Sequence, residues 1–320
     1  MNVYTKPAAC LAAVLFGATA LLAQSTRTLI NDNFSDGTKN GADRATQWFT
    51  VTGTNYVNPV VAASDSNSLN AGAKLDFSGM AANAVSFYSS YSNNALLANF
   101  PSVTLAAAGD YLKFSAQFIY AAVQSAGNAS TGPTLGLYNS NGTRIAADVL
   151  DNAAPAAIAD DTGYRILKRL DNGTSADVLG YEHTNVGGFA TWSGTNTSLG
   201  SEATSTPLAG LTVYTITLKI VLADNLSDLN LIYSIEGGSG TEAIDYEKSF
   251  TAIAAKTTTF DEAVIMPFAG WNAKAAVVSN ILLETNVAIP EPTAFAVFLA
   301  SLSALPFLAF RLCRSRMGRQ

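Results

Sequence analysis

Residues 111–120 read YLKFSAQFIY and show the clearest regular pattern in the chain. Apolar side chains occupy the even positions from Leu112 to Tyr120, whereas Lys113, Ser115 and Gln117 occupy odd ones. Because successive side chains of a β-strand point to opposite faces, this period of two predicts a strand with one buried face and one face in water.

The same alternation recurs at 214–222 and at 229–235, and the turn at 224–228 between them predicts an antiparallel hairpin. Other short runs rich in β-branched and aromatic residues predict further strands, at 29–30, 47–51, 73–77, 84–88, 134–138, 164–168, 178–182, 246–253, 260–266 and 277–284. No stretch between the two ends keeps a helical period, and Pro155 favours a loop at 152–159. The sequence therefore predicts an all-β fold with one antiparallel sandwich.

The N-terminus predicts an export signal. It opens with MNVYTK, continues with an uncharged run at 7–22, and reaches the small residue Ala23. A cationic lead, an apolar run and a small residue are the three parts of a secretory signal peptide. We expect residues 1–23 to be removed, with Ala20 as the alternative cleavage site because Ala18 and Ala20 also form a small-x-small pair.

The C-terminus has three parts with different physical roles. The first part is Pro290, Glu291 and Pro292. It should be extended, because proline fixes φ and removes a backbone donor, and we call it the lead. The 18 residues of 293–310 carry no charge, and as a helix they would measure roughly 27 Å, enough to cross a bilayer core. A basic cluster follows that should set the topology of the tail; it includes Arg311, Arg314 and Arg316.

This order of lead, span and cluster resembles the PEP-CTERM sorting signal of exported proteins in Gram-negative bacteria. The resemblance implies that residues 290–320 are read at the Pro-Glu-Pro motif and processed by a membrane-embedded exosortase. It also implies an inner-membrane precursor and a mature product in the envelope, at the outer surface or in the extracellular matrix. A plain single-pass membrane anchor is the alternative. The short apolar span and the few residues that follow it favour the sorting signal over the anchor.

The remaining 24–289 segment is the expected folded domain, and it is acidic. Of the 18 basic residues 13 lie in it, as do 23 of the 24 acidic residues, so its net charge is −10 against −6 for the whole chain. Scattered negative charge argues against nucleic acid or anionic lipid as a partner of this domain. Both cysteines, Cys10 and Cys313, lie outside it, and a domain of this size can form its core without disulfides.

The two ends of this domain carry a second resemblance. Residues 32–37 read DNFSDG, 260–265 read FDEAVI and 278–283 read VSNILL. These segments resemble those of exported concanavalin A-like domains of the laminin-G and legume-lectin type. The resemblance implies a single jelly-roll β-sandwich over 24–289, with the first and last strands lying close together.

The sequence predicts no catalytic site. Its one histidine, His183, is interpreted as an exposed residue at a strand end. Jelly-roll glucanases carry paired carboxylates on one strand, and the nearest match here is Glu242, Asp245 and Glu247. Asp245 and Glu247 share a face, but Glu242 has the wrong parity unless a bulge intervenes. A glycan-active hydrolase or lyase is therefore the alternative, not the prediction.

A sugar-binding site requires fewer features than a catalytic site, namely an aromatic face and hydrogen-bonding groups. Trp192 lies in the polar, glycine-rich stretch 187–196 and is the predicted glycan contact; alternatively it covers a sheet edge or caps the core. Trp48 and Trp271 lie in or beside apolar strand sequence and should be buried. No cofactor or metal ligand is predicted, although the acidic turns are compatible with a single Ca²⁺ that the sequence does not place.

Together these features predict an exported surface or matrix protein whose domain binds or structures extracellular polysaccharide. A structural matrix component without a specific ligand is a further alternative.

Overall fold

The computed structural model describes residues 25–40, 44–52, 60–63, 79–80, 83–88, 95–120, 132–150, 156–169, 178–184, 196–203, 207–240, 243–266 and 275–288. One compact unit spans Thr26–Val287. The strands in the described part are β1 (Arg27–Asp32), β2 (Trp48–Thr52), β3 (Val60–Ala63), β4 (Asn83–Tyr88), β5 (Ala95–Thr104), β6 (Tyr111–Tyr120), β7 (Thr134–Asn139), β8 (Val149–Leu150), β9 (Thr162–Lys168), β10 (Val178–Thr184), β11 (Asn196–Glu202), β12 (Tyr214–Leu222), β13 (Leu229–Gly237), β14 (Ile244–Ala252), β15 (Thr259–Met266) and β16 (Ala275–Thr285), with a 3-10 turn η1 (Ala156–Ile158).

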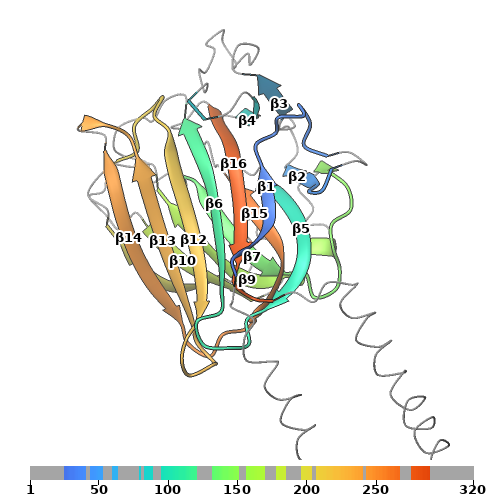
Figure 1. Cartoon of the computed structure of the whole chain (residues 1–320), viewed down its shortest axis with the longest axis vertical. Helices are drawn as coiled ribbons and strands as arrows, with labels where there is room; N and C mark the ends of the chain where they lie inside the picture. The colour runs from blue at the N-terminus through green and yellow to red at the C-terminus, as the bar shows by residue number, and fades with distance from the viewer. Residues whose placement is uncertain are drawn as a thin grey trace, which may run out of the picture. The chain divides into compact units, whose positions relative to one another are not determined.

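These strands form two sheets of eight strands each. Sheet A has the order β14-β13-β12-β6-β16-β4-β3, with β1 also paired to β16, and sheet B has the order β11-β10-β9-β7-β15-β5-β2-β8. Paired strands are antiparallel except β2 and β8, which form a short parallel pair. Figure 1 shows the two layers, with β14, β13, β12, β6 and β16 in the nearer one. The predicted all-β antiparallel sandwich is confirmed.

The alternating pattern places the core between the sheets. On β6, Leu112, Phe114, Ala116 and Phe118 are all fully buried, while the residues between them are exposed or half-buried. The predicted hairpin is confirmed by β12 and β13, whose pairing runs to the Leu222–Leu229 pair. First and last strands are also neighbours as predicted, because β1 pairs with β16.

The central strands of sheet B differ from those of sheet A because both of their faces are buried. The burial of β7 and β15 is nearly continuous instead of alternating. Ile145 and Ile158, from the segment between β7 and β9, cover the outer face of sheet B and pack in one cluster with Tyr138, Leu97 and Val264. A strand covered on both sides loses the alternation that marks a half-wet strand. β5, a central strand of sheet B, shows neither alternation nor a run of β-branched residues and was not predicted; β3, β8 and β11 were missed as well.

Several predictions concern residues outside the described part. They include the strand at 73–77, the burial of Trp271 and both terminal signals. Trp48 is described and fully buried, as predicted. Within the described ranges, no helix has both the length and the apolar composition needed to cross a membrane.

Phe250 of β14 packs across the space between the sheets. An ideal Cβ built on Gly180 of β10 would lie 2.9 Å from Cγ of Phe250, and one on Gly200 of β11 would lie 2.9 Å from its Cδ1. Both distances are shorter than real Cβ contacts allow, so the two glycines leave the room that the ring occupies. The edges of sheets A and B therefore approach each other through one aromatic ring resting on two glycines.

We expect Gly180→Ala to lower the free energy of unfolding by about 1–3 kcal/mol, because the new methyl group overpacks the Phe250 ring. Equilibrium unfolding in urea of the full chain in detergent measures this loss. Gly79→Ala is the matched control, because Gly79 is exposed and no atom lies within 4 Å of the position that its new methyl group would take. A Gly180→Ala protein as stable as the Gly79→Ala protein would contradict the packing described here.

Candidate functional site

The outer face of sheet A carries an open groove of about 350 Å³. We call it the sheet A groove, and its lining residues are Lys113, Thr217, Lys219, Ile232, Ser234, Glu236, Asp245 and Glu247. Seven of these eight side chains are polar or charged. The groove therefore offers hydroxyl, carboxylate and ammonium groups to solvent, with Ile232 as its apolar contact.

Four neighbouring strands position these groups through their register. Residues opposite each other in an antiparallel pair share a face. In sheet A, β6 pairs with β12, β12 with β13, and β13 with β14. Thr217 stands opposite Ser234, and Ser234 stands opposite Glu247. Thr217 is 9% exposed and forms the floor, while Glu247 is exposed. Burying the inner face of each strand thus brings the polar residues of all four strands together on the outer face.

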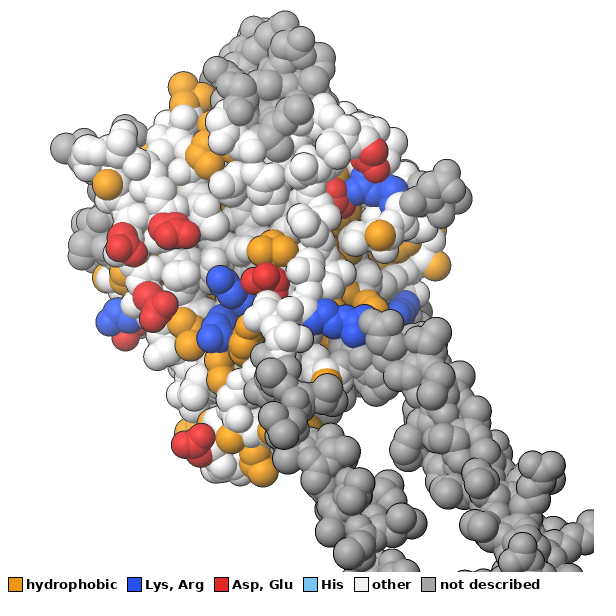
Figure 2. Space-filling view, viewed as in Figure 1, with side chains coloured by type: hydrophobic (Ala, Val, Ile, Leu, Met, Phe, Trp, Pro, Cys, Tyr) orange, Lys and Arg blue, Asp and Glu red, His pale blue; other side chains and the backbone are white. Residues whose placement is uncertain are grey.

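The charges in the groove are separated by strand. Both lysines come from β6 and β12, and all three carboxylates come from β13 and β14. Figure 2 shows this face of the molecule, with acidic side chains over the β13–β14 side and basic side chains nearer the middle. Lys219 is further held by an aromatic ring, because its Nζ lies 4.6 Å from the ring centroid of Tyr111.

Two of the three carboxylates weighed as a possible catalytic set lie in this groove. Asp245 and Glu247 are both exposed and line it together, so their predicted common face is confirmed. Glu242 lies outside the described residues, as does the predicted glycan contact Trp192. The sorting motif Pro290, Glu291 and Pro292 and the cluster Arg311, Arg314 and Arg316 also lie outside them.

The other groove residues were not predicted as a site, although part of the signal was visible. Lys113 falls on the solvent-facing side of the alternation at 111–120, and Thr217 and Lys219 fall on the same side of the alternation at 214–222. Their assembly depends on the pairing of β6 with β12, which lie far apart in the sequence. Glu236, which stands opposite Asp245, was missed because its strand was predicted to end at Ile235.

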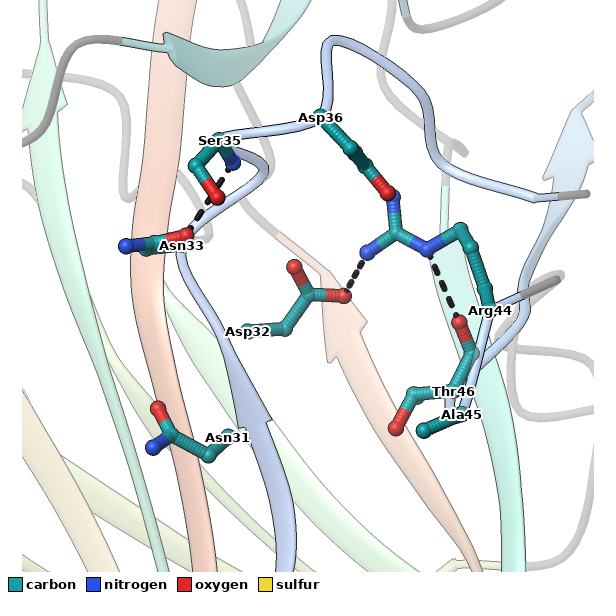
Figure 3. Close-up of a pocket in the computed structure, with 8 residues that line it drawn as sticks. All are labelled: Asn31, Asp32, Asn33, Ser35, Asp36, Arg44, Ala45 and Thr46. Atoms are coloured by element: carbon teal, nitrogen blue, oxygen red, sulfur yellow. Dashed lines mark hydrogen bonds and ion pairs between the residues drawn. The ribbon is translucent and has the colours of Figure 1, made fainter.

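A second cleft, of about 260 Å³, lies where β1 leads into the following loop. Figure 3 shows Arg44 between Asp32 and Asp36, with the three side chains turned toward one another. Asp32 also accepts hydrogen bonds from Nε1 of Trp48 and the backbone N–H of Phe34, each at 2.9 Å. Since these groups satisfy one another, we interpret this cleft as a structural clamp that holds the DNFSDG turn and not as a ligand site.

A buried carboxyl pair lies on the outer face of sheet B. Tyr138 of β7 stands opposite Glu262 of β15 on one side and opposite Gly163 of β9 on the other. Asp161 precedes Gly163 by two residues in the chain. Asp161 and Glu262 have no exposed surface. Burial, followed by the charge of Glu262, raises the pKa of Asp161. Burial also raises the pKa of Glu262, although a hydrogen bond with Asp161 opposes this.

A pair of carboxyl groups in this situation keeps a proton at neutral pH, because two buried like charges cannot both be ionised cheaply. Its complete burial gives a substrate no access, so its effect is on stability.

His183 of β10 is buried on the same face, so its predicted exposure is wrong. It has no exposed surface, and its Nδ1 lies 3.1 Å from the carbonyl oxygen of Asp161. Its ring meets Tyr138 edge-on, with centroids 5.9 Å apart. Burial lowers the pKa of His183, so the imidazole is neutral at pH 7. Within the described ranges, no group of three or more His, Cys, Asp or Glu residues is arranged to hold a metal ion.

The carboxyl pair predicts an unusual pH dependence of stability. Its folded-state pKa values are raised, so above about pH 4 the folded protein keeps protons that the unfolded chain releases. The unfolded state then binds fewer protons, and the free energy of unfolding must fall as pH rises. His183 has the opposite effect below its ordinary pKa of about 6.5, so the range above pH 7 isolates the pair.

We expect the free energy of unfolding in urea to fall between about pH 7 and pH 9, by at most about 1.4 kcal/mol per pH unit for each retained proton. Asp161→Asn should flatten this slope, since an amide does not titrate. The exposed Asp224 provides the control, because Asp224→Asn makes the same chemical change at the surface. Identical slopes for the original chain and Asp161→Asn would rule out the shared proton.

Comparisons with known proteins bear on the fold. No protein-family model matches the chain, and no curated protein matches it. Among solved structures, peanut lectin with a bound 9-residue peptide is 10% identical, with a TM-score of 0.41, over 82% of this chain and 97% of that chain. The lectin UEA-II complexed with galactose is 10% identical, with a TM-score of 0.41, over 82% of this chain and 99% of that chain.

A legume lectin-like domain from Entamoeba histolytica is 13% identical, with a TM-score of 0.37, over 65% of this chain and 85% of that chain. At such identities and TM-scores, none of these similarities identifies a ligand for this chain.

Proposed function

We propose that this chain is an exported surface or matrix protein that binds extracellular polysaccharide through the sheet A groove. The observation that carries the proposal is the composition of the groove. It combines the hydroxyl groups of Thr217 and Ser234 with exposed carboxylates and the ammonium groups of Lys113 and Lys219 on one sheet face. These are the donors and acceptors that sugar hydroxyls need, and an open face formed by four strands accepts a polymer that continues beyond the site.

Exposure of the carboxylates favours binding over hydrolysis. A glycosidase needs one carboxylic acid that stays protonated, and burial in an apolar pocket is the usual means. Glu236, Asp245 and Glu247 are all exposed, whereas the pair that does retain a proton is buried in sheet B. We therefore assign the groove a binding role, and Trp192 remains the predicted stacking contact.

The two chain ends support the export part of the proposal. An N-terminal signal peptide at 1–23 would direct secretion, and the Pro290-Glu291-Pro292 lead, apolar span and Arg311–Arg316 cluster would make 290–320 a PEP-CTERM signal processed by an exosortase. In the same proposal, residues 24–289 form a concanavalin A-like jelly roll. The pairing of β1 with β16 supports it, because it brings the two ends of the domain together.

The groove assignment is tested by blocking it. We expect the full chain, purified in detergent, to retain polysaccharides from an array of plant, algal and bacterial polymers. Ser234→Tyr should weaken this binding at least about tenfold, because the ring would fill the centre of the groove. Ser201→Tyr is the control, since Ser201 is exposed on β11 of sheet B.

A reducing-sugar assay on the same polymers separates binding from turnover. Hydrolysis that disappears in Glu247→Ala would replace the binding role by a catalytic one. An array without any bound polymer, together with no turnover, would leave only a structural matrix role.

The tail assignment predicts a processing defect. In a cell that carries an exosortase, replacing Pro290 and Pro292 by Ala should leave unprocessed precursor in the inner membrane, because the extended lead becomes able to join a helix. Membrane fractionation and the mass of the product measure this. Glu291 is kept in the variant, so its charge is unchanged. Normal maturation of the double variant would exclude Pro-Glu-Pro as the motif.

A further inference from the structure

The register of the sheet A groove places like charges directly opposite each other. Lys219 of β12 stands opposite Lys113 of β6, and Glu236 of β13 stands opposite Asp245 of β14. Like charges in directly opposite positions destabilise an antiparallel pair, while opposite charges stabilise it. Exchanging one lysine with one carboxylate would give two favourable pairs, so this arrangement costs stability that the fold itself does not need.

Nothing in the described part neutralises the two lysines. The ion pairs found there involve Lys39, Arg44, Arg144 and Lys248 as cations, and neither Lys113 nor Lys219 takes part in one. Glu284 of β16 stands opposite Lys113 in register but does not come within ion-pair distance of it. The contact of Lys219 with the Tyr111 ring orients its ammonium group without cancelling its charge.

We propose that Lys113 and Lys219 form a subsite for an anionic substituent, so that the ligand of the groove is an acidic polysaccharide. This inference rests on the proposed polysaccharide binding. An ammonium group acts as a point charge and does not select a planar acid, so the substituent is the carboxylate of a uronic acid or a sulfate ester. Bound between the two lysines, it would remove their mutual repulsion.

The carboxylates at the other end of the groove restrict the spacing of acidic groups along the polymer. Glu236, Asp245 and Glu247 repel a second anion bound next to the first. The groove should therefore prefer a polymer whose acidic sugars alternate with neutral sugars over one that is acidic at every sugar. The negative net charge of the domain opposes any acidic polymer at long range, but at about 0.15 M salt this field is screened beyond about 8 Å.

Titration calorimetry of the full chain in detergent at about 0.15 M NaCl tests the subsite. The probes are a hyaluronan hexasaccharide, with one carboxylate per disaccharide, its neutral methyl ester, a κ-carrageenan hexasaccharide, with one sulfate per disaccharide, and a hexamer of polygalacturonate, acidic at every sugar. We expect hyaluronan or carrageenan to bind tightest and the ester and polygalacturonate to bind several-fold more weakly.

Two sets of variants test which residues cause the preference for spaced acidic groups. Replacing both Lys113 and Lys219 by Gln should raise the Kd of the acidic hexasaccharide about tenfold and change the Kd of the methyl ester much less, because glutamine still donates hydrogen bonds but carries no charge. Glu236→Gln should narrow the difference between hyaluronan and polygalacturonate. Lys256→Gln is the matched control, because Lys256 is exposed in the turn before β15.

The outcomes separate this inference from the function on which it rests. If the lysine double variant binds acidic and neutral probes as the original chain does, while Ser234→Tyr still abolishes binding, the anionic subsite is wrong and the groove remains a glycan site. Tighter binding of a chitosan hexamer than of any acidic probe, lost in Glu247→Gln, would also overturn it. Failure of Ser234→Tyr to affect any probe would overturn both.

Discussion

The period-two geometry of the β-strand is the constraint on which the rest of this structure depends. On β6, burying Leu112 and Phe114 against the opposite sheet leaves Lys113 no position except the outer face. On β12 the same alternation places Thr217 and Lys219 outward. In-register pairing then aligns these positions across four strands. Core and groove are therefore two faces of one pairing pattern, and a slip of a single residue would exchange them.

The two sheets differ in how far their outer faces are exposed to solvent. Sheet A keeps one face open and carries the charged groove there, while the outer face of the central strands of sheet B is covered by apolar packing around Ile145 and Ile158. Covering a sheet face that still bears Asp161 and Glu262 requires that these groups lose charge, since an isolated buried carboxylate is costly. The groove on sheet A thus offers its charged groups to solvent, whereas Asp161 and Glu262 of sheet B are not accessible.

Two signals predicted strands from the sequence: alternation, as on β6, β12 and β13, and runs rich in β-branched and aromatic residues, as on the buried strands β7, β9 and β15. The β12–β13 hairpin was recognised because its alternation and its short turn lie within one stretch of chain. β5 was not, because it is buried on both faces over most of its length and contains Pro101, so neither alternation nor propensity marks it. The burial of His183 was missed for a related reason: its neighbour Tyr138 comes from a strand that is not adjacent in sequence or in the sheet. The members of the groove were visible singly, but their assembly depends on long-range pairing that no local pattern encodes.

The pairing of β1 with β16 has a consequence for how the domain is attached to anything else. Arg27 stands opposite Thr285, so the polypeptide enters and leaves the compact unit at neighbouring points on one side of a sheet. The described strand pairs lie within residues 27–285, so trimming either extension breaks none of them. A tether at the N-terminus and a tether at the C-terminus would thus attach the compact unit at nearly the same point. Exchanging one tether for the other would leave the orientation of the unit nearly unaltered.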